Sequence, residues 1–107
     1  MKDLKSAIVE DRKLVEYLLN LSHPVGAPKA RFFRSHGFSD ANVEQLRDGL
    51  LAIARTAETS AHETEHGVKY VATGELLTPS GTVVNLVTVW IVEPTDPRPR
   101  LVTAYPA

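Results

Sequence analysis

Residues 82–93 read TVVNLVTVWIVE, a run rich in β-branched residues that is apolar at both odd and even positions. Alternate residues of a strand point to opposite faces of a sheet, so this pattern predicts a central strand that is covered on both faces. Pro79-Ser80-Gly81, just before the run, is a turn signal between two stretches of β-forming residues. The second half of the chain is therefore expected to fold as a sheet organised around residues 82–93.

Two more strands are predicted beside this one. Residues 68–73 alternate as a half-buried strand does, and Leu101 to Tyr105 form a last strand that ends at Pro106. Pro94 to Pro99 is expected to be a loop because prolines punctuate it. The connections are short, which favours antiparallel pairing, since parallel strands need a long crossover.

The first half of the chain has a helical period instead. An extended lead-in around residues 7–9 precedes a helix that is expected to run from an Asp11 N-cap to about Asn20. Its apolar positions follow the spacing i, i+3, i+4, i+7: Leu14, Tyr17, Leu18 and Leu21.

Two further helices are predicted. One runs from Pro28 to about His36, with Gly37 as its C′ residue. Phe32 and Phe33 supply its buried ridge. The next begins at a cap on Ser39 or Asp40 and fades near residues 56–59. The expected fold class is α+β, with two to three N-terminal helices packed on one face of a C-terminal four-stranded antiparallel sheet.

Length and composition limit the possible classes of protein. The chain has 107 residues, close to the commonest size of one domain, so residues 1–107 are predicted to form a single domain. There are no cysteines, which excludes disulfides and thiolate chemistry. Residues 1–10 lack the apolar core of a signal peptide, and the longest apolar stretch, residues 83–92, is too short for a membrane helix. We therefore expect a cytoplasmic protein without a membrane partner.

The charge is unevenly distributed, although the net charge is only −1. Residues 27–36 and 97–107 each hold basic residues and no acid, whereas residues 40–65 hold six acids. Two short basic segments could share one surface, or they could be ordinary solvated faces.

The segment around residues 23–33 could carry chemistry. Lys29 lies in the first turn of a predicted helix, where the helix dipole disfavours a cation unless an anion shares the site. Helix N-terminal amides, Lys29 and Arg31 together could hold a phosphate or a carboxylate, with His23 beside them as an acid or base. The alternative is structural, with Lys29 extended over the phenylalanine pair and His23 filling a turn.

The last strand offers a second group of polar side chains. Simple alternation places Leu101, Thr103 and Tyr105 on one face, where the two hydroxyls could line a site. The alternative is that Tyr105 packs its ring in the core and directs its hydroxyl at solvent.

His62-Glu63-Thr64-Glu65-His66 matches the zinc pattern H-E-x-x-H. On a helix, both histidines would share a face, and a third ligand would have to be Glu75, Glu93 or Asp96. The surrounding threonines and the following Gly67 disfavour a helix. In an extended segment His62 and His66 would be about 13 Å apart, too far to chelate one ion. We therefore predict no metal site.

The sequence also resembles a family of small bacterial proteins of unknown function along nearly its whole length. The motifs that carry the resemblance are Tyr17-Leu18-Leu19-Asn20, His23-Pro24 with Gly26, Lys29-Ala30 with Phe32-Phe33, Gly37-Phe38, Gly67-Val68-Lys69-Tyr70, Gly74, Thr78-Pro79-Ser80-Gly81, Thr88-Val89-Trp90-Ile91 and the run Pro99 to Pro106. Similar domains occur at the C-termini of bacterial polymorphic and contact-dependent toxins. Those domains resemble the barnase/EndoU/colicin/RelE superfamily of RNases, whose N-terminal helices precede a four-stranded antiparallel sheet.

The resemblance implies a metal-independent, toxin-type endoribonuclease without a cofactor, in which the RNA 2′-hydroxyl attacks the adjacent phosphate. It implies an RNA substrate and a small immunity or antitoxin protein as partner. The implied catalytic residues are His23, Lys29, Thr103 and Tyr105, and the implied substrate contacts are Arg31, Arg100 and Thr88. Two alternatives stay open: a non-catalytic protein-binding module of a two-gene system, and a minimal zinc hydrolase built on His62, Glu63 and His66.

Overall fold

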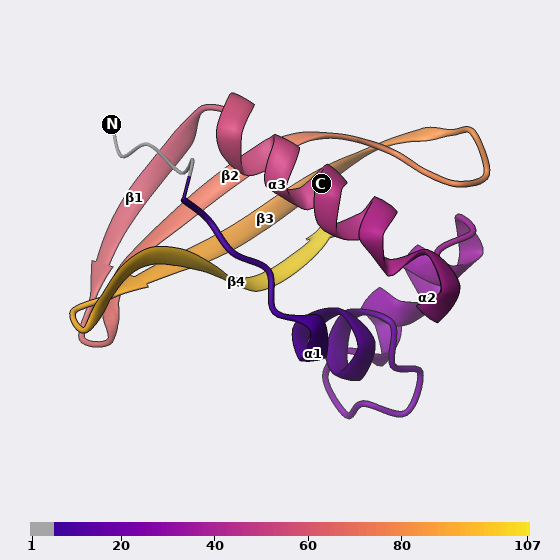
Figure 1. Cartoon of the computed structure of the whole chain (residues 1–107), viewed down its shortest axis with the longest axis horizontal. Coiled ribbons are helices and arrows are strands. Elements are labelled where there is room, and N and C mark those ends of the chain that lie inside the picture. The colour runs from indigo at the N-terminus through magenta and orange to yellow at the C-terminus, as the bar shows by residue number, and fades with distance from the viewer. Residues whose placement is uncertain (1–5) are drawn as a thin grey trace.

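The computed structural model describes residues 6–107. Three α-helices, α1 (Asp11–Lys13), α2 (Ala27–Ser35) and α3 (Val43–Thr56), precede a four-stranded sheet. The strands β1 (Thr59–Thr64), β2 (Gly67–Leu77), β3 (Val83–Glu93) and β4 (Asp96–Pro106) pair in the order β1-β2-β3-β4, each antiparallel to its neighbour. Figure 1 shows α3 running along one face of the sheet, with α1 and α2 on the side of β4. The predicted α+β class and antiparallel sheet are confirmed.

The core lies between α3 and the sheet. The buried side chains alternate along the strands and recur at helical spacing in α3, including Leu46, Leu50, Ile53, Ala72, Leu76, Leu86, Trp90, Leu101 and Ala104. Burying a side chain of this size stabilises the fold by about 1.5–3 kcal/mol. A Cβ on Gly49 would clash with Cδ1 of Leu76, so glycine at this position lets α3 approach β2 closely.

The first predicted helix differs from the expectation in its start, form and end. Glu10 rather than Asp11 is the N-cap, and after one short turn the chain continues as a π-helix, η1 (Leu14–Leu18). The amide of Leu19 donates to the carbonyl of Leu14 at 2.8 Å, which closes the wider π turn. Leu18 and Leu19 are both fully buried, whereas Leu21 lies beyond the helix and is 53% exposed.

The second and third helices follow the prediction. Pro28 lies in the first turn of α2, and Gly37 follows its end with a φ of 94°, a conformation that favours glycine. Ser39 forms a reciprocal capping box with Asn42 before a 3₁₀ turn leads into α3. Phe33 is fully buried, as predicted, while Phe32 is only half-buried.

Strand β4 is longer than predicted. It begins at Asp96, so the segment expected to be a proline-rich loop is largely strand. The prolines are tolerated because β4 is the last strand of the sheet, where their missing N–H groups break no ladder. On its outer side the extended segment around Ile8 pairs in parallel: the Ile8 amide donates to the Pro99 carbonyl at 2.8 Å, and the Leu101 amide donates to the Ile8 carbonyl at 3.2 Å.

A β-bulge changes which face the end of β4 presents. Trp90 pairs with Leu101, but the preceding residue, Val89, pairs with Thr103, so one extra residue is inserted in β4. Because neighbouring residues of β3 face opposite sides, Leu101 faces the core while Thr103 and Tyr105 face the other side. The expectation that all three share one face is therefore wrong.

Candidate functional site

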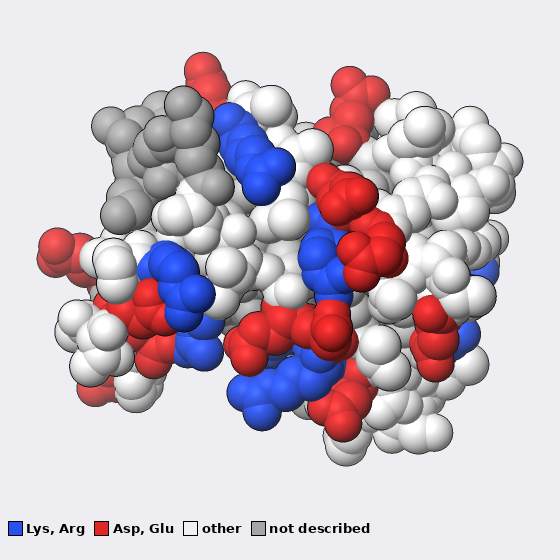
Figure 2. Space-filling view, viewed as in Figure 1, with Lys and Arg blue, Asp and Glu red and all other residues white. Residues whose placement is uncertain are grey.

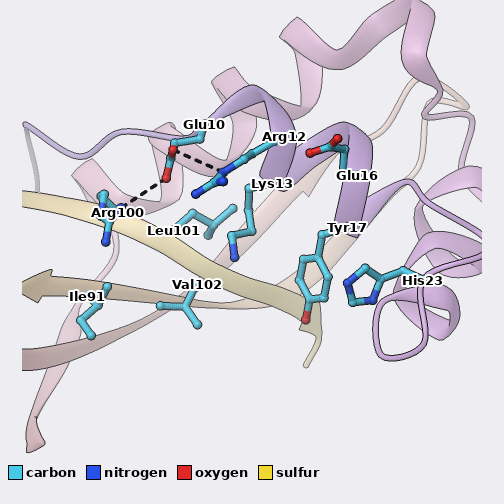
Figure 3. A pocket seen from close by; sticks show the side chains of 10 residues that line it. All are labelled: Glu10, Arg12, Lys13, Glu16, Tyr17, His23, Ile91, Arg100, Leu101 and Val102. Carbon is cyan, nitrogen blue, oxygen red and sulfur yellow. Dashed lines mark hydrogen bonds and ion pairs between the residues drawn. The ribbon is translucent and has the colours of Figure 1, made fainter. Parts of the chain in front are cut away.

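A cleft of about 400 Å³ lies between η1 and β4 (Figure 3). Its walls come from the end of the N-terminal lead-in, from α1 and η1, from the loop before α2, and from β3 and β4. The lining residues are Glu10, Arg12, Lys13, Glu16, Tyr17, His23, Ile91, Arg100, Leu101 and Val102. The cleft thus combines cations, carboxylates, a phenol and an imidazole at the junction of the helices and the sheet.

Tyr17, in η1, contacts side chains from several other elements at the cleft. Its hydroxyl lies 2.9 Å from the hydroxyl of Thr103 in β4. The ammonium groups of Lys13 and Lys29 lie 5.2 Å and 5.8 Å from the centre of its ring, within the range of cation–π attraction. Tyr17 therefore draws together two lysines and a threonine from three separate elements.

His23 completes this cluster. Its ring lies edge-on to Tyr17, with the ring centres 5.0 Å apart. Its Nδ1 accepts hydrogen bonds from the amides of Val25 and Gly26 at 3.0 Å and 2.9 Å. These bonds assign the neutral tautomer with its proton on Nε2.

This tautomer limits what His23 can do. A nitrogen that already carries a proton cannot take another from a substrate hydroxyl, so Nε2 of the neutral ring is not a general base. It can donate a hydrogen bond to an anion. Of the acid or base role expected for His23, the geometry therefore argues against the base and favours a group that donates a hydrogen bond.

Gly26 allows the His23 loop to approach η1. Its φ of −79° is ordinary, so backbone strain is not the reason for glycine here. A Cβ at this position would lie 2.5 Å from the carbonyl oxygen of Tyr17 and 2.9 Å from its ring. A larger residue would have to push the loop or Tyr17 away.

Arg100 lies at the other end of the cleft. It is ion-paired with Glu93, and its Nη1 lies 3.5 Å from the carboxylate of Glu10. Arg12 lies 3.7 Å from the second oxygen of the same carboxylate. Carboxylates of the chain itself thus partly neutralise the cations at this end.

The structure brings together four of the residues proposed from the sequence. His23 and Arg100 line the cleft, and Lys29 and Thr103 contact Tyr17 at its edge. The sequence did not point to Tyr17 and Lys13 as site residues. Their i, i+4 spacing on a helix is a usable signal, but the apolar periodicity assigns Tyr17 to the buried face.

Three proposed residues lie elsewhere. Thr88 has no exposed surface: its hydroxyl donates to the Ala72 carbonyl at 2.6 Å and accepts from the indole of Trp90 at 2.8 Å, so it cannot contact a substrate in this conformation. Tyr105 is 39% exposed on the sheet face away from α3 and does not line the cleft. Arg31 is exposed on α2, also outside the cleft.

The zinc pattern is not helical. His62 and Glu63 lie in the edge strand β1, and His66 lies in the turn that follows, all of them exposed. Within residues 6–107 no group of three or more histidine, aspartate or glutamate side chains is arranged to hold a metal ion. The arrangement that the zinc-hydrolase alternative requires is thus absent from this part of the chain.

Basic and acidic side chains are mixed on the face that carries α3 (Figure 2). Arg47, for example, pairs with both Asp11 and Glu44. This face therefore does not form the continuous basic surface typical of a protein that binds nucleic acid along its whole length. On this face, a contact with a polyanion would have to be confined to a local site.

Comparison with known proteins agrees with the fold. One solved structure, described as "Contact-dependent growth inhibition toxin - immunity protein complex from Klebsiella pneumoniae 342", contains a chain that superimposes with a TM-score of 0.73 at 15% sequence identity. The match covers 94% of this chain and 92% of that one. No curated protein matches the sequence. Among residues 6–107, the structure contains no helix with the length and apolar character needed to cross a membrane. Residues 1–107 match one family throughout, and the chain belongs to that family, described as Domain of unknown function (DUF6883).

Proposed function

We propose that the protein is a metal-independent endoribonuclease that acts as the toxin of a bacterial toxin–immunity or toxin–antitoxin pair. The observation that carries this proposal is the convergence of His23, Lys13 and Lys29 on Tyr17, whose hydroxyl bonds to Thr103. Cations and neutral hydrogen-bond donors around one point suit a phosphate whose negative charge grows during reaction.

The proposed reaction is attack of an RNA 2′-hydroxyl on the adjacent phosphorus. The bond from O2′ to phosphorus forms and the bond from phosphorus to O5′ breaks, which leaves a 2′,3′-cyclic phosphate and a 5′-hydroxyl. Lys13 and Lys29 stabilise the charge on the phosphate, and His23 donates from Nε2 to one of its oxygens.

The proton balance involves a carboxylate and solvent. Glu16 lines the cleft, and its carboxylate forms no ion pair with any residue from 6 to 107, so we assign it as the group that takes the proton of the 2′-hydroxyl. The leaving O5′ takes a proton from water, since the cleft is open to solvent. In this scheme the side chains of Lys13, Lys29 and His23 stabilise the negative charge that grows on the phosphate.

The fold likeness fits either component of a toxin–immunity pair, because it shows the fold alone. The polar composition of the cleft favours the toxin. One observation favours a non-catalytic binding module instead: Glu10, Glu16 and Glu93 offset the cations of the cleft, and the net charge of the chain is −1.

Induced expression in a bacterial host distinguishes these two functions. We expect wild-type protein to arrest growth and to cut total RNA into discrete fragments, whereas the double variant His23→Ala, Lys29→Ala does neither. Arg55→Ala is the matched control, because it removes an exposed cation of α3 that is outside the cleft. Normal growth and intact RNA with folded wild-type protein would contradict the nuclease and support the binding module.

A further inference from the structure

We propose that Arg12 and Arg100 form a second phosphate subsite, and that the Glu10 carboxylate occupies this subsite when no nucleic acid is bound. The inference rests on the proposed function, because it concerns the same cleft. It adds that the cleft binds two neighbouring phosphates of one strand, the first at Tyr17 and the second at Arg100.

Backbone pairing holds Glu10 in this position. Ile8 pairs with Arg100 in a parallel bridge at the outer edge of β4, through hydrogen bonds to the two neighbours of Arg100 in that strand. Glu10 follows Ile8 by two positions, and its carboxylate lies beside the side chain of Arg100. The contact is therefore a consequence of how the N-terminal segment is anchored. The anchored segment places the Glu10 carboxylate between Arg12 and Arg100. In the proposed complex, a phosphate of the ligand takes this position.

The ion pairs of Glu10 are weak enough for a ligand to replace them. Their distances, 3.5 Å to Arg100 and 3.7 Å to Arg12, are longer than a good charge-assisted hydrogen bond. The side chains are 38% exposed for Glu10 and 73% exposed for Arg12, and solvent-exposed pairs contribute little. A phosphate can exchange with this carboxylate at small cost.

Arg100 would stay in place after such an exchange. Its guanidinium is also paired with Glu93, which does not line the cleft. That second contact, to a residue at the end of β3, holds the Arg100 guanidinium whether or not Glu10 is present. Glu93 therefore acts as a positioning residue for the subsite.

The cleft has the layout of two separate anion sites. Figure 3 shows Glu10, Arg12 and Arg100 at one end of the labelled side chains, Tyr17 and His23 at the other, and Lys13 between them. A nucleic acid strand repeats one phosphate per nucleotide, so a ligand that fills both ends must carry at least two phosphates. A mononucleotide can fill only one.

Binding of thymidine oligonucleotides with one and with three phosphodiester groups tests the second subsite. These probes lack the 2′-hydroxyl and cannot be cleaved by the proposed reaction, so calorimetry at low salt reports binding alone. We expect Glu10→Gln to bind the three-phosphate probe about two- to five-fold more tightly than wild type, which corresponds to removing the two weak ion pairs that Glu10 forms with Arg100 and Arg12. It should bind the one-phosphate probe as wild type does.

Two further variants make the test specific. Glu16→Gln also removes one negative charge from the cleft but has no ion pair with Arg100 or Arg12 among residues 6–107, so its gain should be the same for both probes. Adding Arg100→Gln to Glu10→Gln should abolish the gain for the longer probe. The salt dependence of Glu10→Gln should steepen by about 0.7 in the log–log slope, as expected for one more phosphate contact on a single strand.

An equal gain of Glu10→Gln for both probes would overturn the second subsite, and so would a gain that survives the loss of Arg100. A melting curve like that of wild type confirms that the variants are folded. The binding test of the second subsite and the cleavage test of the proposed function can fail independently. A protein that cuts no RNA but shows the length-dependent gain has the two-phosphate site without the nuclease. A protein that cuts RNA without the gain has the nuclease without the second subsite.

Discussion

The hydroxyl of Tyr17 lies 2.9 Å from the hydroxyl of Thr103, and this contact joins residues 86 positions apart in the sequence. It connects η1 to the part of β4 that follows the bulge. Without the bulge, Thr103 would face the core together with Leu101, so the irregularity in β4 is what makes the contact possible. The cleft is therefore a product of how the two halves of the chain meet.

The contact between Tyr17 and Thr103 should matter for both stability and cleavage. We expect Tyr17→Phe to lower the free energy of unfolding by about 0.5–1.5 kcal/mol, as for one intramolecular hydrogen bond, and to slow RNA cleavage about 100-fold. Urea unfolding and a cleavage time course measure the two effects. Thr103→Val should lose a similar stability, and the double variant should lose little more than either single change. Fully additive losses would show that the two hydroxyls are not coupled.

The tautomer of His23 predicts different effects for two replacements. In His23→Asn the side-chain oxygen can still accept the amide of Val25 in an Asx turn, whereas His23→Ala leaves the loop without an acceptor. We expect the asparagine variant to be about 1 kcal/mol more stable than the alanine variant. Both should lose cleavage, because neither provides the donor of Nε2. An asparagine variant that cleaves like wild type would remove His23 from the reaction.

Gly26 is predicted to be a steric requirement of the site. Gly26→Ala should destabilise the protein by about 1–3 kcal/mol and should reduce cleavage, since the new Cβ displaces Tyr17 or the His23 loop. Gly81→Ala is the matched control: Gly81 has a φ of 90° and a Cβ added there would meet nothing within 4 Å, so it should lose stability through backbone strain alone. A Gly26 variant with normal cleavage would show that the loop adapts without moving Tyr17.

Asp96 should contribute to the pH dependence of stability. Side-chain and backbone hydrogen bonds from Arg98 hold the pKa of the Asp96 carboxyl below its ordinary value. A carboxyl whose pKa is lower in the folded state stabilises the protein above its unfolded pKa, and that stability is lost as the pH falls through the folded pKa. We expect the unfolding free energy of Asp96→Asn to fall less steeply than that of wild type below about pH 4. Parallel slopes for the two proteins would contradict this contribution.

The parts of the fold with strong local signals could be predicted from the sequence. Helix α2 begins near a proline and ends at a glycine, and β3 has an unbroken run of β-branched residues. Strand β1 had no such signal: five of its six residues are exposed, so no apolar alternation marks it. Its identity as a strand depends on pairing with β2, which is a tertiary effect.

The candidate site was predictable only in part, for related reasons. His23 and Lys29 could be proposed from the sequence because the turn and the helix start that hold them are local features. The bulge that directs Thr103 to Tyr17 is set by pairing between β3 and β4, and strict alternation hides it. The position of Thr88 was hidden for the same kind of reason, since its hydroxyl accepts a buried hydrogen bond from the Trp90 indole that only the assembled sheet creates.

Ribonuclease activity of this cleft is tested most directly by incubating purified protein with single-stranded RNA in the presence of a metal chelator. We expect cleavage that persists without divalent metal, produces 2′,3′-cyclic phosphate ends, and stops at any position where a 2′-deoxynucleotide replaces the ribonucleotide. We expect no cleavage by the double variant His23→Ala, Lys29→Ala. Intact RNA after incubation with folded wild-type protein, or cleavage that the double variant retains, would contradict the assignment of this cleft as a ribonuclease site.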